Sequence, residues 1–325
     1  MFDLIIIGGS AAATAAGIYA ARRNLNFKII TKEFGGEVAT SGEIGNWPGD
    51  GMTDGIALAD KFRDHLKMYN VDVEEGVEVA KIIKQDDGTF CITAKTDQAP
   101  KMASGMMPDG NNNPMKCDYT AKTVIVTTGV HPKELTVPGE KEFRNKGVSY
   151  CTICDGPLFG GKVTTVVGGG NSALEAGLML ADIASKVYVI NKNAFFKGDD
   201  ILIEKLNAMK DKVEIIYEAL ASQIVGDKFV TAIKYKDKKG DEHELKTDGI
   251  FVHVGNIPNS WLVPDNVEKT KFGEIKVNAK CETNIPGLYA AGDVTDVAFK
   301  QIVIAAGQGC TAVLSAVEYL NRLNK

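Results

Sequence analysis

The sequence has few histidines, no excess of basic residues and no apolar run that approaches the length of a membrane span. Its 325 residues include 4 histidines, and 37 Lys and Arg against 42 Asp and Glu give a net charge of −5. Since nucleic acids attract basic surfaces, this balance disfavours a nucleic-acid partner. A bilayer span needs about 20 apolar residues, so we expect no membrane partner either.

We expect no signal peptide, because residues 3–7 already read as a strand and leave no room for one. We therefore expect a cytoplasmic protein, in which the 6 cysteines do not form a disulfide framework. Those without a close neighbour in sequence are expected to be buried, unreactive thiols. They are Cys91, Cys117, Cys281 and Cys310.

The remaining cysteines lie in the stretch Cys151-Thr152-Ile153-Cys154-Asp155. This spacing can close a small disulfide ring, and opening such a ring takes two electrons, so we interpret Cys151 and Cys154 as a redox pair. Asp155, directly behind them, can shuttle a proton. Half of a zinc site is the alternative, but no second ligand pair exists and the histidines are scattered. We expect no metal, and we expect the histidines to be ordinary surface or core residues.

Glycine-rich turns between a strand and a helix occur twice. In the first, an apolar run precedes Gly8-Gly9-Ser10, a helix is expected over Ala11–Arg22 and a strand over Phe27–Ile30. Such a turn lets the backbone approach a pyrophosphate at a helix N-terminus. Ser10 and Ala13 stand where the strict pattern has glycines, and both are small enough for the turn.

The second turn, Gly168-x-Gly170-x-x-Ala173, follows a strand at Val163–Val167 and opens a helix at Asn171–Asp182. A further strand is expected at Val187–Ile190. This is the complete context of a dinucleotide site. The residues expected to bind a pyridine nucleotide here are Gly168, Gly170, Asn171, Ser172 and Ala173.

The residues after that last strand do not identify the coenzyme. A carboxylate there binds the ribose of NAD, whereas a basic cluster binds the 2′-phosphate of NADP. The chain has Asn191, Lys192 and Asn193, with Lys197 further on. Asn191 can bond a ribose hydroxyl but also tolerates a phosphate. Both NADPH and NADH therefore remain open as coenzymes.

Repetition of one plan predicts an α/β protein with two Rossmann-like dinucleotide-binding domains, the second inserted into the first. We expect an FAD-binding domain over residues 1–134 and 250–325. The NAD(P)-binding domain, which carries the redox-active cysteine pair, is expected over residues 135–249. The chain would cross between domains near Pro138-Gly139 and return near Gly255-Asn256.

One segment, Asp97 to Lys116, differs in composition from its surroundings. It is rich in Met, Pro, Gly and Asn, and includes Asn111-Asn112-Asn113-Pro114. Such a composition is typical of an elongated, mobile hairpin loop. We interpret it as a passive surface insertion, with partner docking as the alternative.

Other segments suit a flavin in the first domain. Asp293 follows an apolar strand, where its carboxylate can accept a hydrogen bond from a ribityl hydroxyl. A long helix opens at Lys300-Gln301, and its N-terminal partial positive charge would stabilise a reduced flavin. The full set of expected FAD ligands is Gly8, Ser10, Ala11, Ala12, Gly35, Gly36, Glu37, Val38, Asn46, Val79, Thr128, Gly129, Gly292, Asp293, Lys300, Gln301 and Ile302.

Over essentially its whole length the chain resembles the low-molecular-weight thioredoxin reductase family and the flavoprotein portion of bacterial alkyl hydroperoxide reductase. The most specific segments are Thr128-Gly129, Val137-Pro138-Gly139-Glu140, 147–156, 168–173 and 290–294. The resemblance implies FAD, a homodimer and a swivel between domains that presents the nicotinamide and the disulfide to the flavin in turn. It also implies that Cys154 lies nearest the flavin, that Cys151 attacks the partner disulfide and that Asp155 is the general acid-base residue.

The chain departs from this family where the coenzyme is selected. NADPH-binding members carry a His-Arg-Arg run where this chain has Asn191-Lys192-Asn193, and a further Arg where it has Lys197. The NADH-using hydroperoxide reductase relatives carry a glutamate at Asn191 and an N-terminal thioredoxin-like extension. Since this chain begins at the flavin domain, we expect its disulfide partner to be a separate protein.

The expected function is that of a thioredoxin-disulfide reductase. Electrons would pass from reduced pyridine nucleotide through FAD and the Cys151-Cys154 disulfide to a thioredoxin-like protein. A glutaredoxin-like or peroxiredoxin-linked partner is one alternative, and electron input from ferredoxin or another donor is a second. The sequence leaves the donor, the protein substrate and the oligomeric state open.

Replacing either thiol tests the role of the pair. We expect Cys151→Ser and Cys154→Ser each to retain flavin, because neither change touches the expected FAD ligands, and to lose turnover with thioredoxin, because a single thiol cannot cycle through an internal disulfide. Flavin absorbance and a thioredoxin-coupled assay measure the two quantities. Full turnover by either variant would contradict the assignment.

Overall fold

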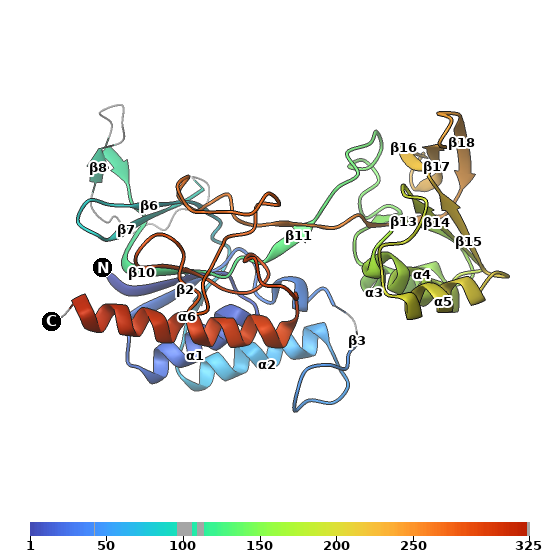
Figure 1. Cartoon of the computed structure of the whole chain (residues 1–325). Coiled ribbons are helices and arrows are strands. Elements are labelled where there is room, and N and C mark those ends of the chain that lie inside the picture. Colours follow the sequence, from blue (N-terminus) through green and yellow to red (C-terminus); the bar gives the residue numbers. More distant parts are fainter. Residues whose placement is uncertain (42, 96–105, 109–113, 324–325) are drawn as a thin grey trace. The chain divides into compact units, whose positions relative to one another are not determined.

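The computed structural model describes residues 1–41, 43–95, 106–108 and 114–323. Within this part of the chain, clustering of contacts separates two compact units. The first unit combines Met1–His131 with Ile257–Lys325, and the second is Pro132–Asn256. The second unit is therefore an insertion in the sequence of the first (Figure 1).

The first unit is built on a sheet in the order β5-β2-β1-β10-β7-β6, with β21 beside β10. β1 lies parallel to both β2 and β10, whereas β7 is antiparallel to β10. The bounds are β1 Phe2–Ile7, α1 Ala11–Arg22, β2 Phe27–Ile30, η1 Gly36–Val38, β3 Glu43–Ile44, β4 Thr53–Asp54, α2 Gly55–Met68, β5 Val73–Glu74, β6 Val79–Lys84, β7 Phe90–Ala94, β8 Met106–Pro108, β9 Pro114–Lys116, β10 Tyr119–Val126, β21 Leu288–Ala290 and α6 Ile302–Leu323.

Alternation along β1 gives this sheet two buried faces. Leu4 and Ile6 join the cluster that contains the alanines of α1 and the apolar residues of α6. Ile5 and Ile7 join the opposite cluster, which contains residues of β6 and β7 and the segment 262–294. A strand covered on both faces needs a continuous apolar run, which is what the sequence shows between Leu4 and Ile7.

Helix α6 corrects the expectation that no segment approaches the length of a membrane span. Among the described residues it is the one helix long and apolar enough, by length and composition, to pass that test. Part of that apolar surface packs on α1, and Ala312, Val313 and Ala316 are buried there. Gly309 permits the close crossing, because a Cβ at this position would lie 2.1 Å from the carbonyl oxygen of Ala12.

The second unit repeats the plan with a parallel sheet in the order β12-β19-β13-β14-β15, beside an antiparallel sheet in the order β16-β17-β18. The crossing segments β11 and β20 pair with each other. The bounds are β11 Val130–Pro132, β12 Val148–Ser149, α3 Thr152–Asp155, η2 Gly156–Phe159, β13 Val163–Gly168, α4 Asn171–Ile183, β14 Lys186–Asn191, α5 Asp200–Ala208, β15 Val213–Tyr217, β16 Leu220–Gly226, β17 Val230–Lys236, β18 Glu242–Lys246, β19 Gly249–His253 and β20 Asn256–Pro258.

The core of this unit also has two layers. On one face of the parallel sheet, Val166, Val187 and Val189 pack with α4 and with Leu206 of α5. The other face includes Val167 and packs against the apolar residues of the antiparallel sheet. The helices therefore cover one face of the parallel sheet. The ends of β13 and β19 lie beside the start of α4.

One sequence expectation differs from the observed chain path. Residues 250–256 were expected in the first domain, but β19 pairs with β12 and β13, which places them in the second unit. A strand end that borders a linker carries no sequence mark of the unit to which it belongs. The expected hairpin at 97–116 lies mostly outside the described residues, apart from β8 and β9, which pair antiparallel.

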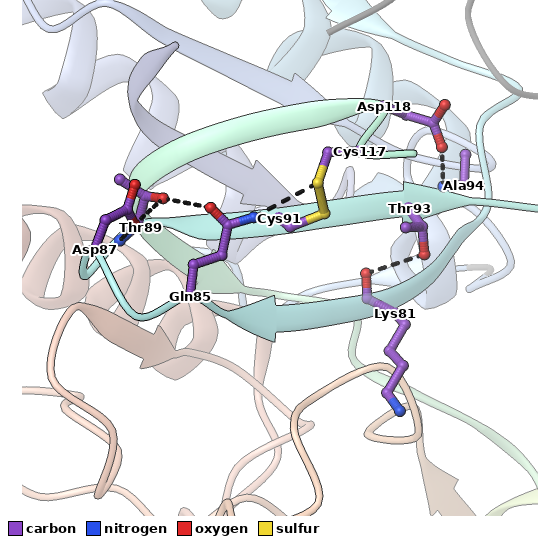
Figure 2. The surroundings of a disulfide bond; sticks show 9 residues. All are labelled: Lys81, Gln85, Asp87, Thr89, Cys91, Thr93, Ala94, Cys117 and Asp118. Atoms are coloured by element: carbon purple, nitrogen blue, oxygen red, sulfur yellow. Dashed lines mark hydrogen bonds between the residues drawn. A yellow bond between two sulfur atoms is a disulfide. The ribbon is translucent and has the colours of Figure 1, made fainter. Parts of the chain in front are cut away.

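A disulfide joins Cys91 on β7 to Cys117, which directly follows β9 and lies two residues before β10 (Figure 2). Both residues are buried, and the Gln85 side-chain amide lies 3.6 Å from the sulfur of Cys117. The expectation of free thiols is therefore wrong at these two positions. Antiparallel pairing of β7 with β10 brings the two strands together although the cysteines are 26 residues apart in sequence. Cys281 is a buried free thiol, as expected, and burial raises its pKa to about 11.

Removing this disulfide should destabilise the first unit. Closing a loop of 26 residues in the unfolded chain corresponds to about 3 kcal/mol. We expect the double variant Cys91→Ala with Cys117→Ala to lose about this much unfolding free energy in urea, and Cys310→Ala, which removes a half-buried free thiol, to lose little. Peptide mapping after alkylation without reduction should recover Cys91 and Cys117 in one cross-linked fragment. Alkylation of both residues under these conditions would contradict the disulfide.

Candidate functional site

The first glycine turn is enclosed by the ends of three parallel strands. Gly8 follows β1, and its N–H donates to the carbonyl of Ile30 at 2.9 Å. Its φ is +130°, and a Cβ would lie 2.3 Å from the carbonyl oxygen of Thr127. Only glycine fits this position without displacing the neighbouring strand. The turn therefore delivers the chain directly into α1, and Ala11 and Ala12 form the buried first turn of that helix.

The N-terminus of α1 is chemically suited to an anion. Ser10 is the N-cap residue but makes no side-chain capping bond, and the first turn holds no acidic residue. By contrast, Asp54 caps α2 by accepting a hydrogen bond from the N–H of Ala57 at 2.9 Å. An uncapped helix start with its partial positive charge is the ordinary environment of a bound phosphate. This observation fits the pyrophosphate of a dinucleotide.

The expected second loop meets this turn. The N–H of Gly35 donates to the carbonyl of Gly9 at 2.8 Å, and both Gly35 and Gly36 have positive φ, at +98° and +53°. A Cβ on Gly36 would lie 3.4 Å from that of Ser10. Residues 35–38, with Val38 buried, are thus brought together with the first fingerprint, although they are separate in sequence.

The second glycine turn has the same construction. Gly168 ends β13, and a Cβ there would lie 2.2 Å from the carbonyl oxygen of His253 on the neighbouring strand β19. Gly170 is the N-cap of α4, without a side-chain capping bond and without an acidic residue in the first turn. A Cβ on Gly170 would meet nothing within 4 Å. Open space in front of an uncapped helix start again fits a pyrophosphate.

Cys154 lies on the short helix α3 of the same unit. Cys151 precedes the helix and is disulfide-bonded. Its N–H donates to the hydroxyl of Ser149 at 3.0 Å, and that hydroxyl donates to the carbonyl of Cys151 at 3.1 Å. The N–H of Asp155 donates to the same carbonyl at 3.2 Å. The side chain of Cys154 lies outside the described residues.

His253 links the cysteine helix to the second turn, a connection that sequence reasoning missed. Its Nε2 lies 2.7 Å from the hydroxyl of Thr152, and its Nδ1 lies 2.7 Å from the hydroxyl of Ser172. Burial lowers its pKa to about 4, so the ring is neutral at pH 7. His253 is thus a half-buried, hydrogen-bonded histidine that lies between two expected site segments.

Comparison with known proteins agrees with this geometry. The family model for pyridine nucleotide-disulphide oxidoreductases matches residues 2–309. The chain belongs to this family. Membership implies binding of FAD and NAD(P)H, and the uncapped starts of α1 and α4 fit both dinucleotides.

Two curated proteins that resemble this oxidoreductase have names that state an activity. It is 39% identical over 323 residues to a subunit of the alkyl hydroperoxide reductase of Pseudomonas putida, covering 99% of this chain and 58% of that protein. It is 37% identical over 322 residues to an NADH dehydrogenase of Bacillus subtilis (strain 168), with 99% of this chain and 59% of the relative covered. The chain thus spans somewhat under two thirds of these curated relatives.

One solved structure matches this chain over nearly its whole length. The crystal structure of T. acidophilum thioredoxin reductase matches with a TM-score of 0.80 at 36% identity, covering 99% of both chains. The expected resemblance to thioredoxin reductases and hydroperoxide reductase flavoproteins is confirmed, as is the α/β fold with two Rossmann-like domains.

Carboxylates gather near the first turn of this oxidoreductase. Enclosure by the surrounding protein raises the pKa of Glu37, a hydrogen bond from Thr40 opposes the shift, and the nearby carboxylate of Asp293 adds to it. Burial raises the pKa of Asp293, which the charge of Lys300 partly offsets. The carboxylates of Glu37 and Asp293, both expected flavin ligands, are therefore close enough to interact electrostatically.

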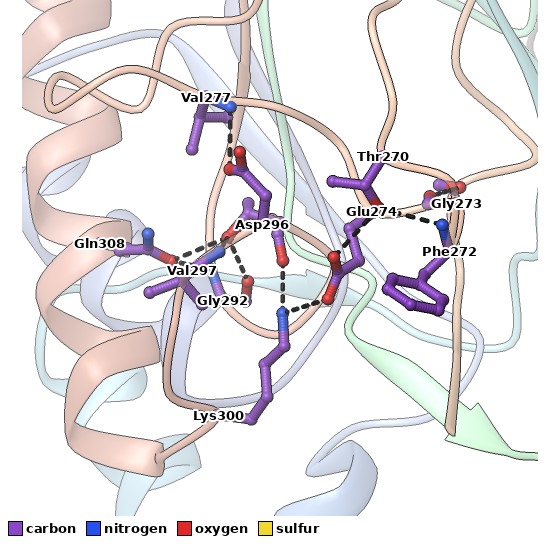
Figure 3. A network of polar contacts seen from close by, with 12 residues as sticks. Thr270, Phe272, Gly273, Glu274, Val277, Gly292, Asp296, Val297, Lys300 and Gln308 are labelled. Carbon is purple, nitrogen blue, oxygen red and sulfur yellow. Dashed lines mark hydrogen bonds and ion pairs between the residues drawn. The ribbon is translucent and has the colours of Figure 1, made fainter. Parts of the chain in front are cut away.

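Several expected FAD ligands use their polar atoms within the protein. Lys300 forms an ion pair with Glu274 at 3.0 Å, and the N–H of Gly292 donates to the Gln308 side chain at 2.8 Å (Figure 3). Asn46 donates to the side chain of Gln301 at 3.2 Å, which joins the expected loop to the start of α6 at Ile302.

Three more expected flavin ligands lie in the interior or near the linker of the oxidoreductase. Thr128 donates to the carbonyl of Asn259 at 2.6 Å, and Gly129 accepts from the N–H of Asn259 at 2.9 Å. These bonds join the two chain segments that lead into and out of the second unit. Val79 is buried in the sheet core with Ile5 and Ile7. Its side chain is apolar and forms no hydrogen bond with a ligand.

The coenzyme loop is organised by Asn191, which is fully buried. Its amide nitrogen donates to the carbonyl of Phe195 at 3.0 Å, and its oxygen accepts from the N–H of Asn193 at 3.0 Å. The side chain expected to meet a ribose thus shapes its own loop. Lys192 and Lys197 are exposed, as are Asn171 and Ser172 at the start of α4.

Glu140 is a second residue whose role sequence reasoning missed. It is 1% exposed and accepts hydrogen bonds from the N–H groups of Leu135 and Thr136, at 2.7 and 2.6 Å. It also accepts from the hydroxyl of Tyr150 at 2.8 Å. Tyr150 directly precedes Cys151, so this buried carboxylate ties the linker to the start of the redox segment.

The neutral state of His253 predicts a pH dependence of stability. Its pKa falls from an ordinary 6.5 to about 4 on folding, so between these values the unfolded chain binds more protons. The unfolding free energy should therefore decrease as pH falls through this window. We expect His253→Gln to reduce this slope, whereas His243→Gln, at an exposed position, should keep it. Urea unfolding at a series of pH values measures both, and equal slopes in wild type and His253→Gln would refute the burial effect.

Proposed function

We propose that this oxidoreductase is a flavin-dependent disulfide reductase that passes electrons from reduced pyridine nucleotide to a thioredoxin-like protein. In this proposal the first unit binds FAD and the second binds NAD(P)H. The Cys151-Cys154 pair is the last internal carrier. A homodimer is part of the same proposal, because the family resemblance implies it, and a cytoplasmic location is part of it on the sequence expectation alone.

One observation carries the proposal: the cysteine helix and the dinucleotide turn belong to one hydrogen-bonded unit. Helix α3 contacts α4 directly, and His253 bridges Thr152 and Ser172. A nucleotide at Gly168–Gly170 would therefore lie in the same rigid part as the thiols. That arrangement suits a relay in which both groups exchange electrons with one flavin.

The residues of each turn have a definite task. The uncapped N–H groups at the starts of α1 and α4 would hold the two pyrophosphates, and Gly8 and Gly168 allow each turn to pack against the carbonyl of the neighbouring strand. Bound FAD supplies an acceptor for a hydride and a donor of two electrons. Glu37 and Asp293 would orient the flavin's polar groups by hydrogen bonding.

In this proposal Cys151, Cys154 and Asp155 carry out the thiol–disulfide exchange. Two electrons and two protons convert the Cys151-Cys154 disulfide into two thiols. The thiolate of Cys151 then attacks the partner disulfide, and Cys154 displaces the reduced partner, which restores the internal disulfide. Asp155, the next residue along the chain after Cys154, would move the proton in this proposal.

A second partner class has its own support. The similarity to a subunit of alkyl hydroperoxide reductase extends over 99% of this chain, which favours a peroxiredoxin-linked carrier as the alternative acceptor. Side-by-side turnover with a thioredoxin, a glutaredoxin and a peroxiredoxin-linked domain separates these possibilities. The acceptor with the highest kcat/KM identifies the partner class.

Anaerobic titration of the purified protein tests the electron donor. We expect NADPH or NADH to bleach the flavin absorbance rapidly, because the second turn is built for a pyridine nucleotide. Comparing the two reductants identifies the coenzyme. If the 2′-phosphate contacts Lys192 and Lys197, the double variant Lys192→Ala with Lys197→Ala should bind NADPH more weakly, with a smaller effect on the binding of NADH. Dithionite provides the control for complete reduction. Failure of both nucleotides, in protein that dithionite bleaches, would contradict the proposed donor and point to ferredoxin or another reductant.

A further inference from the structure

The hydrogen bonds of His253 form a continuous path between two parts of the proposed site. Thr152, at 4% exposure, is the first residue of α3 and follows Cys151 directly. Ser172 is the second residue of α4 and is exposed beside the glycine turn. The imidazole ring lies between the two hydroxyls, 2.7 Å from each.

A neutral imidazole permits this path in only two arrangements. One ring nitrogen carries a proton and donates, and the other accepts. If Nδ1 carries the proton, Ser172 accepts from it and Thr152 donates to Nε2. If Nε2 carries the proton, both hydroxyls reverse their roles. A change at one end of the ring therefore forces a change at the other.

We propose that His253 is a positioning residue that couples nucleotide binding at the second turn to the orientation of Thr152 beside Cys151. The inference rests on the proposed function, because it requires a phosphate at the start of α4. Ser172 then donates its proton to a phosphate oxygen and can only accept from the ring. This selects the Nδ1–H form of His253 and obliges Thr152 to donate to Nε2.

The far end of the path lies at the redox segment. Thr152 is buried, so its hydroxyl has no ready replacement for the ring nitrogen as a partner. The backbone of Cys151 is already held by the hydroxyl of Ser149 on its N–H and carbonyl. Nucleotide binding therefore fixes the direction of the Thr152–His253 hydrogen bond, and with it the orientation of the Thr152 hydroxyl beside Cys151.

The ring tautomer is the direct readout. Protein with ¹⁵N-labelled histidine is examined by NMR near pH 7, with ADP-ribose and its 2′-phosphate as probes that carry the pyrophosphate but no nicotinamide. We expect the probe that binds, as measured by calorimetry, to convert the His253 signals to the Nδ1–H pattern. His253→Gln assigns these signals by removing them, and His243→Gln is the matched control at an exposed histidine of the same unit.

Ser172→Ala tests the path without disturbing the core, because Ser172 is exposed. We expect this variant to bind the probe about 3- to 10-fold more weakly, the effect of one hydrogen bond, and at saturation to show no tautomer change. Conversion to the Nδ1–H pattern in Ser172→Ala would overturn the inference.

Thr152→Val tests the other end by turnover. We expect kcat with a disulfide substrate to fall about 3- to 10-fold with unchanged probe affinity. Thr165→Val is the matched control, since the hydroxyl of Thr165 is buried without a hydrogen-bond partner in the described part of the chain, and it should keep kcat. Unchanged kcat in Thr152→Val would overturn the inference.

The outcomes separate this inference from the proposed function. Probe binding without a tautomer change in the wild type would overturn the role of His253 and leave the reductase proposal standing. No binding of either probe would overturn the nucleotide site and the coupling together. Binding with the expected tautomer, lost in Ser172→Ala, supports the coupling.

Discussion

The structure depends on one steric constraint that occurs in both units: a glycine at the end of a parallel strand lies against a carbonyl of the next strand. A Cβ on Gly8 would lie 2.3 Å from the oxygen of Thr127, and one on Gly168 would lie 2.2 Å from that of His253. Any side chain would separate the strands. The close approach turns the chain sharply, and the following helix begins with no side-chain cap on its N–H groups.

The strand that supplies the carbonyl also supplies the next functional contact. Beyond Thr127, Thr128 bonds to Asn259 and joins the segments that lead to the second unit. In the second unit His253 itself extends its ring toward Thr152 and Ser172. Packing and function therefore share residues, and a substitution at His253 alters both the proton balance of folding and the path to the cysteines.

Local patterns predicted much of this architecture. The helix at Ala11–Arg22 and the strand at Phe27–Ile30 have the expected bounds, because apolar runs and alanine-rich periodicity act within a few residues. The long-range contacts were not predictable in the same way. The Cys91–Cys117 disulfide depends on the pairing of β7 with β10, and the buried amide of Asn191 depends on the fold of its own loop.

The sequence by itself determined the two strand–glycine–helix units, the cysteine pair and the family, since each is written in residues a few positions apart. Only the tertiary structure decided which distant groups meet. It united Asn46 with Gln301, Glu140 with Tyr150, and His253 with both Thr152 and Ser172. Hydrogen-bond partners of this kind are selected by strand order and burial, and those properties arise only when separate segments pack against one another.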